Sequence, residues 1–210
     1  MSITNNINDK LSLNNLEIKY RHTNVPLDYY KEMISWGQFG FKHMNRKCNE
    51  TVWCREKYRI IAQGMGLLGN ALVSYSFAYH GHKIVPEPIV YHKINDCIIK
   101  SGSIYDVGVL IHGNKYEFIL LLEVKLYKKT SENLPSFKNV DYVYMEIPKA
   151  KYILEKCRAV PLGILLELNK PPKNVRIPPH ILEIRGINGK KACERIYNGV
   201  LNWCSKRNIL

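Results

Sequence analysis

Closely spaced cysteines are absent from this sequence, in which none of the six cysteines forms a Cys-x-x-Cys pair. That absence excludes zinc ribbons and zinc fingers, and it favours buried, reduced thiols. Long apolar runs are absent too, because no window approaches the roughly 18 uninterrupted apolar residues that a membrane span needs. Residues 1–15 are polar and lack the pattern of a secretory signal. We therefore expect a soluble, cytoplasmic protein with no membrane partner.

Acidic residues are scarce relative to basic ones. The chain has 18 Asp and Glu against 31 Lys and Arg, which gives a formal net charge of +13. Such an excess favours polyanionic partners, of which nucleic acid is the commonest, although a soluble protein can be basic without one. The basic residues are dispersed, and no run of like charges indicates a disordered tail.

The length and the hydrophobic content suit one ordinary domain with an appendage, since 46% of the 210 residues are hydrophobic. We predict a mostly helical extension over residues 1–60. Within it Pro26 opens one helix, and a second covers about 50–63 before Gly64 and Gly66 interrupt the pattern. Residues 61–210 are then expected to form an α/β domain.

The α/β domain is predicted from alternating helical and strand patterns. In chain order it has a helix over 67–80, strands over 83–85, 104–111 and 116–126, a helix over 148–159, strands over 162–168 and 181–185, and a helix over 190–206. Gly81 is a natural stop for the first of these helices. Mixed strands and helices in this order predict a mixed β-sheet flanked by helices.

The most informative segment is the predicted hairpin over 104–126. Gly113 and Asn114 stand between two apolar runs, which is a signal for a two-residue turn. With these two residues as the turn, His112 faces Lys115 across the hairpin, and this pairing fixes the register of every other pair.

The register brings three charged side chains to one face. Asp106 lies opposite Leu121, and side chains alternate along a strand, so Glu123 and Lys125 share the face of Asp106. The opposite face is wholly apolar and is predicted to be core. Its members are Tyr105, Val107, Val109 and Ile111 with Phe118, Leu120, Leu122, Val124 and Leu126.

This charged face predicts chemistry at phosphate. Two neighbouring carboxylates, Asp106 and Glu123, repel each other unless a proton or a cation lies between them. A hard divalent cation such as Mg²⁺ takes oxygen ligands, polarises a phosphate and activates a water. Lys125 would then stabilise developing negative charge. The alternative is an exposed Glu–Lys strand pair beside a solvated Asp.

Asp106, the hairpin and Glu123-Val124-Lys125 resemble the core of the PD-(D/E)XK nuclease superfamily, with Tyr105 in place of the Pro of the nominal motif. Within that superfamily, residues 66–185 are most similar to archaeal Holliday junction resolvases, which also place a Ser/Gly loop like 101–103 before the Asp. An archaeal virus is one source that the resemblance allows, in which case the compartment is the host cytoplasm.

The resemblance implies a Mg²⁺-dependent or Mn²⁺-dependent homodimer that cleaves branched DNA in replication, recombination or repair. It implies a metal held by Asp106, Glu123 and the backbone carbonyl of Val124, with Lys125 as a catalytic residue. The DNA contacts that we predict are Ser101, Ser103, Lys128 and Lys129.

Asn70 is the one departure from the resolvase pattern, since those enzymes carry a Glu at the corresponding helix position. Asn is a weaker, neutral ligand, and a solvated helix residue is the equally weighted alternative. Two other functions stay open: an exonuclease or restriction-type nuclease on the same core, and a nucleic-acid-binding protein that kept the fold and lost catalysis.

Overall fold

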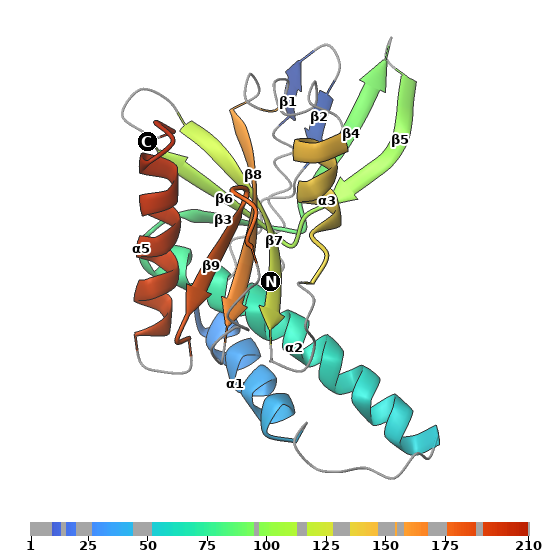
Figure 1. Cartoon of the computed structure of the whole chain (residues 1–210), viewed down its shortest axis with the longest axis vertical. Helices are drawn as coiled ribbons and strands as arrows, with labels where there is room; N and C mark the ends of the chain where they lie inside the picture. The colour runs from blue at the N-terminus through green and yellow to red at the C-terminus, as the bar shows by residue number, and fades with distance from the viewer. Residues whose placement is uncertain are drawn as a thin grey trace, which may run out of the picture.

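The computed structural model of the chain describes residues 10–13, 16–19, 27–43, 52–94, 97–112, 117–127, 135–146, 154, 158–167, 176–187 and 191–209. Two β-sheets form its framework (Figure 1). The larger has five strands in the order β3 (Lys83–Pro86), β6 (Val107–His112), β7 (Glu117–Tyr127), β8 (Ala159–Glu167) and β9 (Ile181–Arg185). The pairs β3–β6 and β6–β7 are antiparallel, whereas β7–β8 and β8–β9 are parallel. This mixed sheet with flanking helices confirms the predicted α/β class.

The smaller sheet is antiparallel and was not predicted. Its order is β1 (Lys10–Leu13), β2 (Leu16–Lys19), β4 (Ile89–Ile94) and β5 (Cys97–Ile104). The region before residue 60 therefore contributes two short strands besides the predicted helices, and helix remains the larger share of its described residues. Its pairing partners come from far along the chain, so local pattern alone does not reveal them.

The two sheets are joined at a double bend. β3 leads into β4 through Glu87 and Pro88, and β5 leads into β6 through Tyr105 and Asp106. The bends are bonded to each other, because Tyr105 N–H donates to the Pro88 carbonyl at 3.0 Å and Glu87 N–H donates to the Asp106 carbonyl at 3.4 Å. Asp106 thus sits where the chain passes from one sheet to the other.

One side of the five-stranded sheet, which we call the α2 face, is covered by α2 (Val52–Tyr79) and α5 (Ala192–Ser205) (Figure 1). Alternate residues of β6 and β7 enter this core together with apolar side chains of both helices. These residues are Val107, Val109, Ile111, Phe118, Leu120, Leu122 and Val124, with Leu72, Val73 and Phe77 of α2 and Ile196 and Val200 of α5.

The opposite side, the α3 face, is also buried in part. Leu110, Ile119, Leu121 and Leu165 of the sheet pack there with Phe137, Val140 and Val143. Phe137 precedes a short helix, α3 (Lys138–Asp141), which contains Val140. Val143 lies in the π-helical turn η1 (Tyr142–Glu146) that continues α3. Tyr105 belongs to this cluster, which corrects its predicted place beside Val107. The bend at Tyr105 and Asp106 breaks the strict alternation on which that prediction depended.

The hairpin register differs from the prediction by two residues. His112 pairs with Glu117 rather than with Lys115, and residues 113–116 lie outside the described residues. A shift of two residues leaves every side chain on its predicted face, because the side-chain period is also two. The prediction therefore named the wrong partners and the right faces for β6 and β7.

The helix interruption predicted at Gly64 and Gly66 does not occur. α2 runs unbroken from Val52 to Tyr79, across residue 60, and packs against α1 (Leu27–His43). A glycine costs a helix only about 1 kcal/mol, an amount that packing readily offsets.

The remaining predictions mostly hold. α1 begins at the residue after Pro26, α2 ends just before Gly81, which has a φ of +84°, and β3, β8, β9 and α5 match their predicted ranges closely. The helix predicted over 148–159 lies largely outside the described residues; Leu154 is helical, and Ala159 already begins β8. No helix within the described segments has the length and apolarity that a bilayer crossing requires.

Candidate functional site

Asp106 is held against the main chain of β7. Its N–H donates to the Leu122 carbonyl at 2.9 Å, and its Oδ2 accepts the Val124 N–H at 2.7 Å. The carboxylate therefore continues the β6–β7 ladder where the backbone of β6 has bent away. This bond places an acidic group from the bend directly beside the peptide that follows Glu123.

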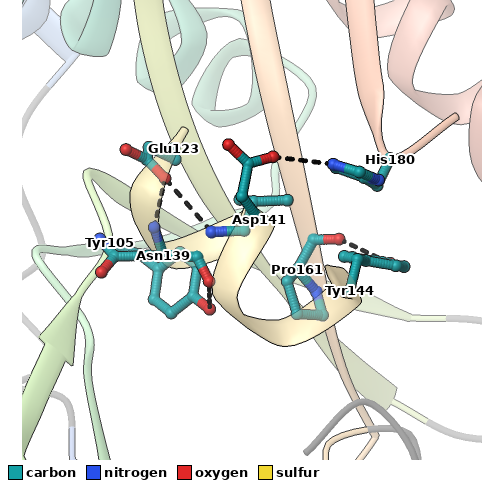
Figure 2. A network of polar contacts seen from close by, with 8 residues as sticks. Tyr105, Glu123, Asn139, Asp141, Tyr144, Pro161 and His180 are labelled. Carbon is teal, nitrogen blue, oxygen red and sulfur yellow. Dashed lines mark hydrogen bonds and ion pairs between the residues drawn. The ribbon is translucent and has the colours of Figure 1, made fainter. Parts of the chain in front are cut away.

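Glu123 lies on the α3 face and is 5% exposed. Its Oε2 accepts the N–H groups of Asn139 at 3.0 Å and of Val140 at 3.3 Å (Figure 2). Amide donors of this kind stabilise the ionised form of a carboxylate. The carboxylate thus ties the central strand to the start of α3, a contact that the sequence did not reveal.

Lys125 lies two residues beyond Glu123, on the same face and 34% exposed at its side chain. Its Nζ is 3.3 Å from Glu123 Oε1, the oxygen that α3 does not use. The structure therefore brings Glu123 and Lys125 together as an ion pair, in which the carboxylate is buried and the lysine side chain is partly exposed.

The short helix is fixed at its other end by a His–Asp contact. Asp141 Oδ1 is 2.9 Å from His180 Nε2, and His180 is 7% exposed (Figure 2). The His180 ring stacks on Tyr144 with a centroid separation of 4.8 Å, and the Tyr144 hydroxyl donates to the Pro161 carbonyl at 3.0 Å. These contacts hold the segment that orients Glu123, so His180 and Asp141 support the site from behind.

Two further residues shape this region. Tyr105 is 1% exposed, its hydroxyl donates to the Asn139 carbonyl at 3.4 Å, and burial, then the Glu123 charge, raises the pKa of that hydroxyl. Gly163 pairs with Glu123 across β7 and β8, and a Cβ there would lie 2.8 Å from Phe137 Cδ1. Only a residue without a side chain lets Phe137 close against the sheet at this point.

Asn70 lies on the other side of the sheet. A Cβ on its neighbour Gly69 would lie 3.2 Å from Val124 Cγ1, so α2 approaches β7 closely there, whereas Gly66 meets open space. Asn70 is partly buried, and its Oδ1 is buried without a hydrogen-bond partner among the described residues. Because α2 covers the α2 face and the Glu123 carboxylate bonds to α3, Asn70 and that carboxylate lie on opposite sides of β7.

The predicted DNA contacts are placed only in part. Ser101 and Ser103 belong to β5 rather than to a loop, and Ser103 pairs with Val90 of β4. The pairing with β4 overrides the loop character that Ser and Gly lend to this stretch. Lys128 and Lys129 lie outside the described residues.

The donors that we predicted for a divalent ion are two carboxylates and one carbonyl. One oxygen of each carboxylate already accepts backbone N–H groups, which leaves Asp106 Oδ1 and Glu123 Oε1, with the Val124 carbonyl as the third oxygen that the resemblance implies. Hard oxygen donors of this type fit Mg²⁺ or Mn²⁺, which keep several waters. Within the described ranges, no group of three or more His, Cys, Asp or Glu side chains could hold a metal ion, so the carboxylates supply two ligands at most.

The residues that sequence reasoning missed are Asn139, Val140, Asp141, His180 and Gly163, because their roles depend on contacts between distant segments. A lone Gly inside the apolar strand 162–168 was the one available signal of close approach.

Comparison of the chain with protein-family models, with curated proteins and with solved structures yields no match.

Proposed function

We propose that this protein is a Mg²⁺-dependent DNA endonuclease of the PD-(D/E)XK superfamily that hydrolyses phosphodiester bonds of branched DNA, such as Holliday junctions. The observation that carries the proposal is the 2.7 Å bond from Val124 N–H to Asp106 Oδ2. It brings the predicted Asp to the strand segment Glu123-Val124-Lys125, whose own two charged groups are 3.3 Å apart.

The surroundings support the same activity. The mixed five-stranded sheet flanked by helices is the architecture that the resemblance implies. The net charge of +13 suits a polyanionic substrate, and its phosphate contacts would make affinity dependent on salt. Branched DNA as the substrate, and recombination or repair as the process, come from the resemblance alone.

Each residue would have a distinct task in hydrolysis. A bound Mg²⁺ or Mn²⁺ would polarise the phosphate and lower the pKa of a water. Asp106 and Glu123 would bind it with the oxygens that the backbone leaves available, while Val124 N–H and the amides of Asn139 and Val140 keep both carboxylates oriented. Lys125, the exposed member of its ion pair, would stabilise negative charge that develops on the phosphate.

A second candidate is a nucleic-acid-binding protein that kept this fold and lost catalysis. The burial of Glu123 favours it, since this carboxylate already caps α3 and pairs with Lys125. The neutral Asn70 favours it as well, because the resolvase pattern has a Glu there. Both candidates predict salt-dependent DNA binding, and only the first predicts metal-dependent cleavage.

The test is cleavage of a labelled four-way junction, a matched linear duplex and a plasmid with Mg²⁺, with Mn²⁺ and with EDTA. Cleavage of the junction in either metal and none in EDTA supports the endonuclease. Binding without cleavage in every condition supports the second candidate. Progressive trimming of the linear duplex from its ends would instead indicate an exonuclease.

We also propose that the active form is a homodimer. A two-fold DNA junction is cut symmetrically most simply by a two-fold protein, and such dimers are the commonest oligomers. Light scattering should give twice the chain mass of 24.4 kDa. A mass of one chain at micromolar concentrations, with and without DNA, would contradict the dimer.

A further inference from the structure

Glu167 at the end of β8 and Glu183 on β9 carry buried oxygens without a hydrogen-bond donor among the described residues. Glu167, the last residue of β8, is 1% exposed, and both of its carboxylate oxygens are buried without a hydrogen-bond partner among the described residues. Glu183 on β9 has one buried oxygen, Oε1, in the same state. Burial of a carboxylate without hydrogen-bond donors costs free energy, so the ionised pair needs a further proton or donor to satisfy these oxygens.

Arg185 supplies only part of the compensation. Its Nε is 3.6 Å from Glu167 Oε2, and its Nη2 is 2.8 Å from Glu183 Oε2. Among the described residues, these two carboxylates and one guanidinium group leave one negative charge in excess. One proton removes that excess and gives one carboxyl an O–H to donate to the other, which is the usual resolution for a close carboxyl pair.

The charged groups on the packed neighbouring elements do not supply a second cation. Lys125 on β7 is paired with Glu123, and Asp141 on α3 is paired with His180. Arg195 on α5 donates to the carbonyls of Arg185 and Gly186. Among the described residues, Arg185 is therefore the one cation recorded in contact with either carboxylate.

Electrostatics agree with this geometry. Burial, followed by the hydrogen bond and the charge of Glu183, raises the pKa of Glu167 to about 7, against the partial opposition of Arg185. Titration of such a pair belongs to both carboxyls together rather than to one residue.

The pair lies on the same face as Lys125. Lys125 pairs with Leu165 of β8, and Leu165 pairs with Glu183 of β9, so all three occupy one row across the parallel strands. Glu167 is two residues further along β8. In open α/β sheets, ligands bind outside the carboxyl ends of the parallel strands. Glu167 is the last residue of β8, so the pair lies near this edge of the sheet.

We propose that Glu167 and Glu183 form an acid–base site, in which two carboxyl groups share one proton beside the Arg185 guanidinium group. Glu183, with a side chain 16% exposed, is the member that can exchange this proton with a bound molecule or with water. The site is separate from Asp106 and Glu123, and it takes a proton rather than a metal ion as its ligand.

One role for this site depends on the proposed nuclease function. In phosphodiester hydrolysis a water oxygen bonds to phosphorus, the bond from phosphorus to the leaving oxygen breaks, and that oxygen needs a proton. The dyad would give its shared proton to the leaving oxygen, directly or through a water. The attacking water releases one proton to solvent, and the dyad recovers one proton from solvent, so the step balances. Groups that titrate near the working pH are the effective donors in such steps.

The test is ¹³C NMR titration of the Glu side-chain carboxyls from about pH 5 to 9 in EDTA buffer. A titration near neutrality lies far from the ordinary Glu value of about 4.3, so it is easily recognised. We expect one in the wild type, its loss in Glu167→Gln, and a downward shift in Glu183→Gln. Glu194→Gln, which alters an exposed residue of α5, is the matched control and should leave the titration unchanged. If Glu167→Gln does not fold, Glu183→Gln decides alone.

Titration of every Glu carboxyl in the acidic range would overturn the proposal. So would disappearance of the neutral titration on adding millimolar Mg²⁺, since a cation would then occupy the pair. The catalytic role is tested by the pH dependence of junction cleavage, whose limb near neutrality should move in Glu183→Gln and would stay in place if the dyad were only structural. Should the wild type cleave nothing, the nuclease proposal fails, and the NMR titration still decides the dyad.

Discussion

The carboxylate of Asp106 accepts a hydrogen bond of 2.7 Å from the main-chain N–H of Val124, one residue beyond Glu123. This contact links the bend between the two sheets to the strand that carries the other candidate ligands. The contact does not require a negative charge, because the amide oxygen of an Asn can accept the same hydrogen bond. Asp106→Asn therefore removes a proposed metal ligand while keeping the contact that organises the backbone.

The Glu123–Lys125 pair gives a first prediction on stability. Lys125→Met should lower the free energy of unfolding by about 1–2 kcal/mol, because it removes the cation that contacts the buried Glu123 carboxylate among the described residues. The loss stays modest because solvent screens the partly exposed lysine. Urea denaturation of both proteins measures the change. Lys31→Met is the control, since Lys31 pairs with Asp28 on the exposed surface of α1 and should give no measurable difference. Equal losses in both variants would contradict the special role of Lys125.

Gly163 gives a prediction on the geometry of the site. Gly163→Ala places a Cβ 2.8 Å from Phe137 Cδ1 and 3.1 Å from Ile181 Cγ1, so Phe137 must move and take α3 with it. We expect a loss of about 1–3 kcal/mol in stability, as for other overpacked sites, and faster hydrogen exchange at the amides of Asn139 and Val140. Gly199→Ala, where the nearest atom is 3.6 Å away, should be tolerated on both measures. Unchanged exchange at Asn139 in Gly163→Ala would mean that Phe137 yields without moving α3.

The placement of the charged side chains of β7 could be predicted from sequence better than the rest of the site. Apolar alternation over 104–126 placed Glu123 and Lys125 on one face, and a register error of two residues did not disturb that result. The predicted register was wrong because Gly-Asn favours a two-residue loop locally, whereas His112 pairs with Glu117 in the structure.

The capping of α3 by Glu123 could not be predicted. Residues 138–146 carry no strong helix signal, and their structure depends on contacts with β7, β8 and His180 that are distant in sequence. β4 and β5 were not predicted, and Pro86 and Pro88 precede them in a stretch where proline disfavours a central strand. In the structure they flank the bend at Glu87, whose φ of +45° turns the chain toward the second sheet.

The Glu167–Glu183 dyad predicts how stability depends on pH. The folded-state pKa of Glu167, about 7, exceeds its ordinary value of 4.5, so the folded protein holds a proton that the unfolded chain releases. The contribution is therefore fully present below about pH 4.5 and is lost as pH rises through 7, at about 1.4 kcal/mol per unit of pKa difference. Thermal melts from pH 5 to 8 should show a steeper fall for wild type than for Glu167→Gln. Parallel curves would show that Glu167 binds no proton on folding.

The substitution Asn70→Glu tests whether Asn70 belongs to the proposed metal site. Asn70→Glu puts a charge where the amide oxygen is buried without a hydrogen-bond partner among the described residues, so the variant should melt at a lower temperature in EDTA. If Asn70 completes the metal site from the α2 side, millimolar Mg²⁺ should restore the melting temperature, bind more tightly by calorimetry and raise activity at low metal. Destabilisation that Mg²⁺ does not relieve, with metal affinity unchanged, would place Asn70 outside the site.

Cleavage of a four-way junction by wild type and Asp106→Asn measures the central claim most directly. Wild type should cut in Mg²⁺ or Mn²⁺ and not in EDTA, while Asp106→Asn should lose at least about 100-fold in rate, as expected when a metal-assisted step loses its metal ligand. The variant should keep its circular dichroism spectrum and its junction affinity, and Asp28→Asn on the exposed surface should cut like wild type. Cutting at equal rates by wild type and Asp106→Asn in excess Mg²⁺, or cutting by wild type in EDTA, would contradict a metal-dependent site at Asp106.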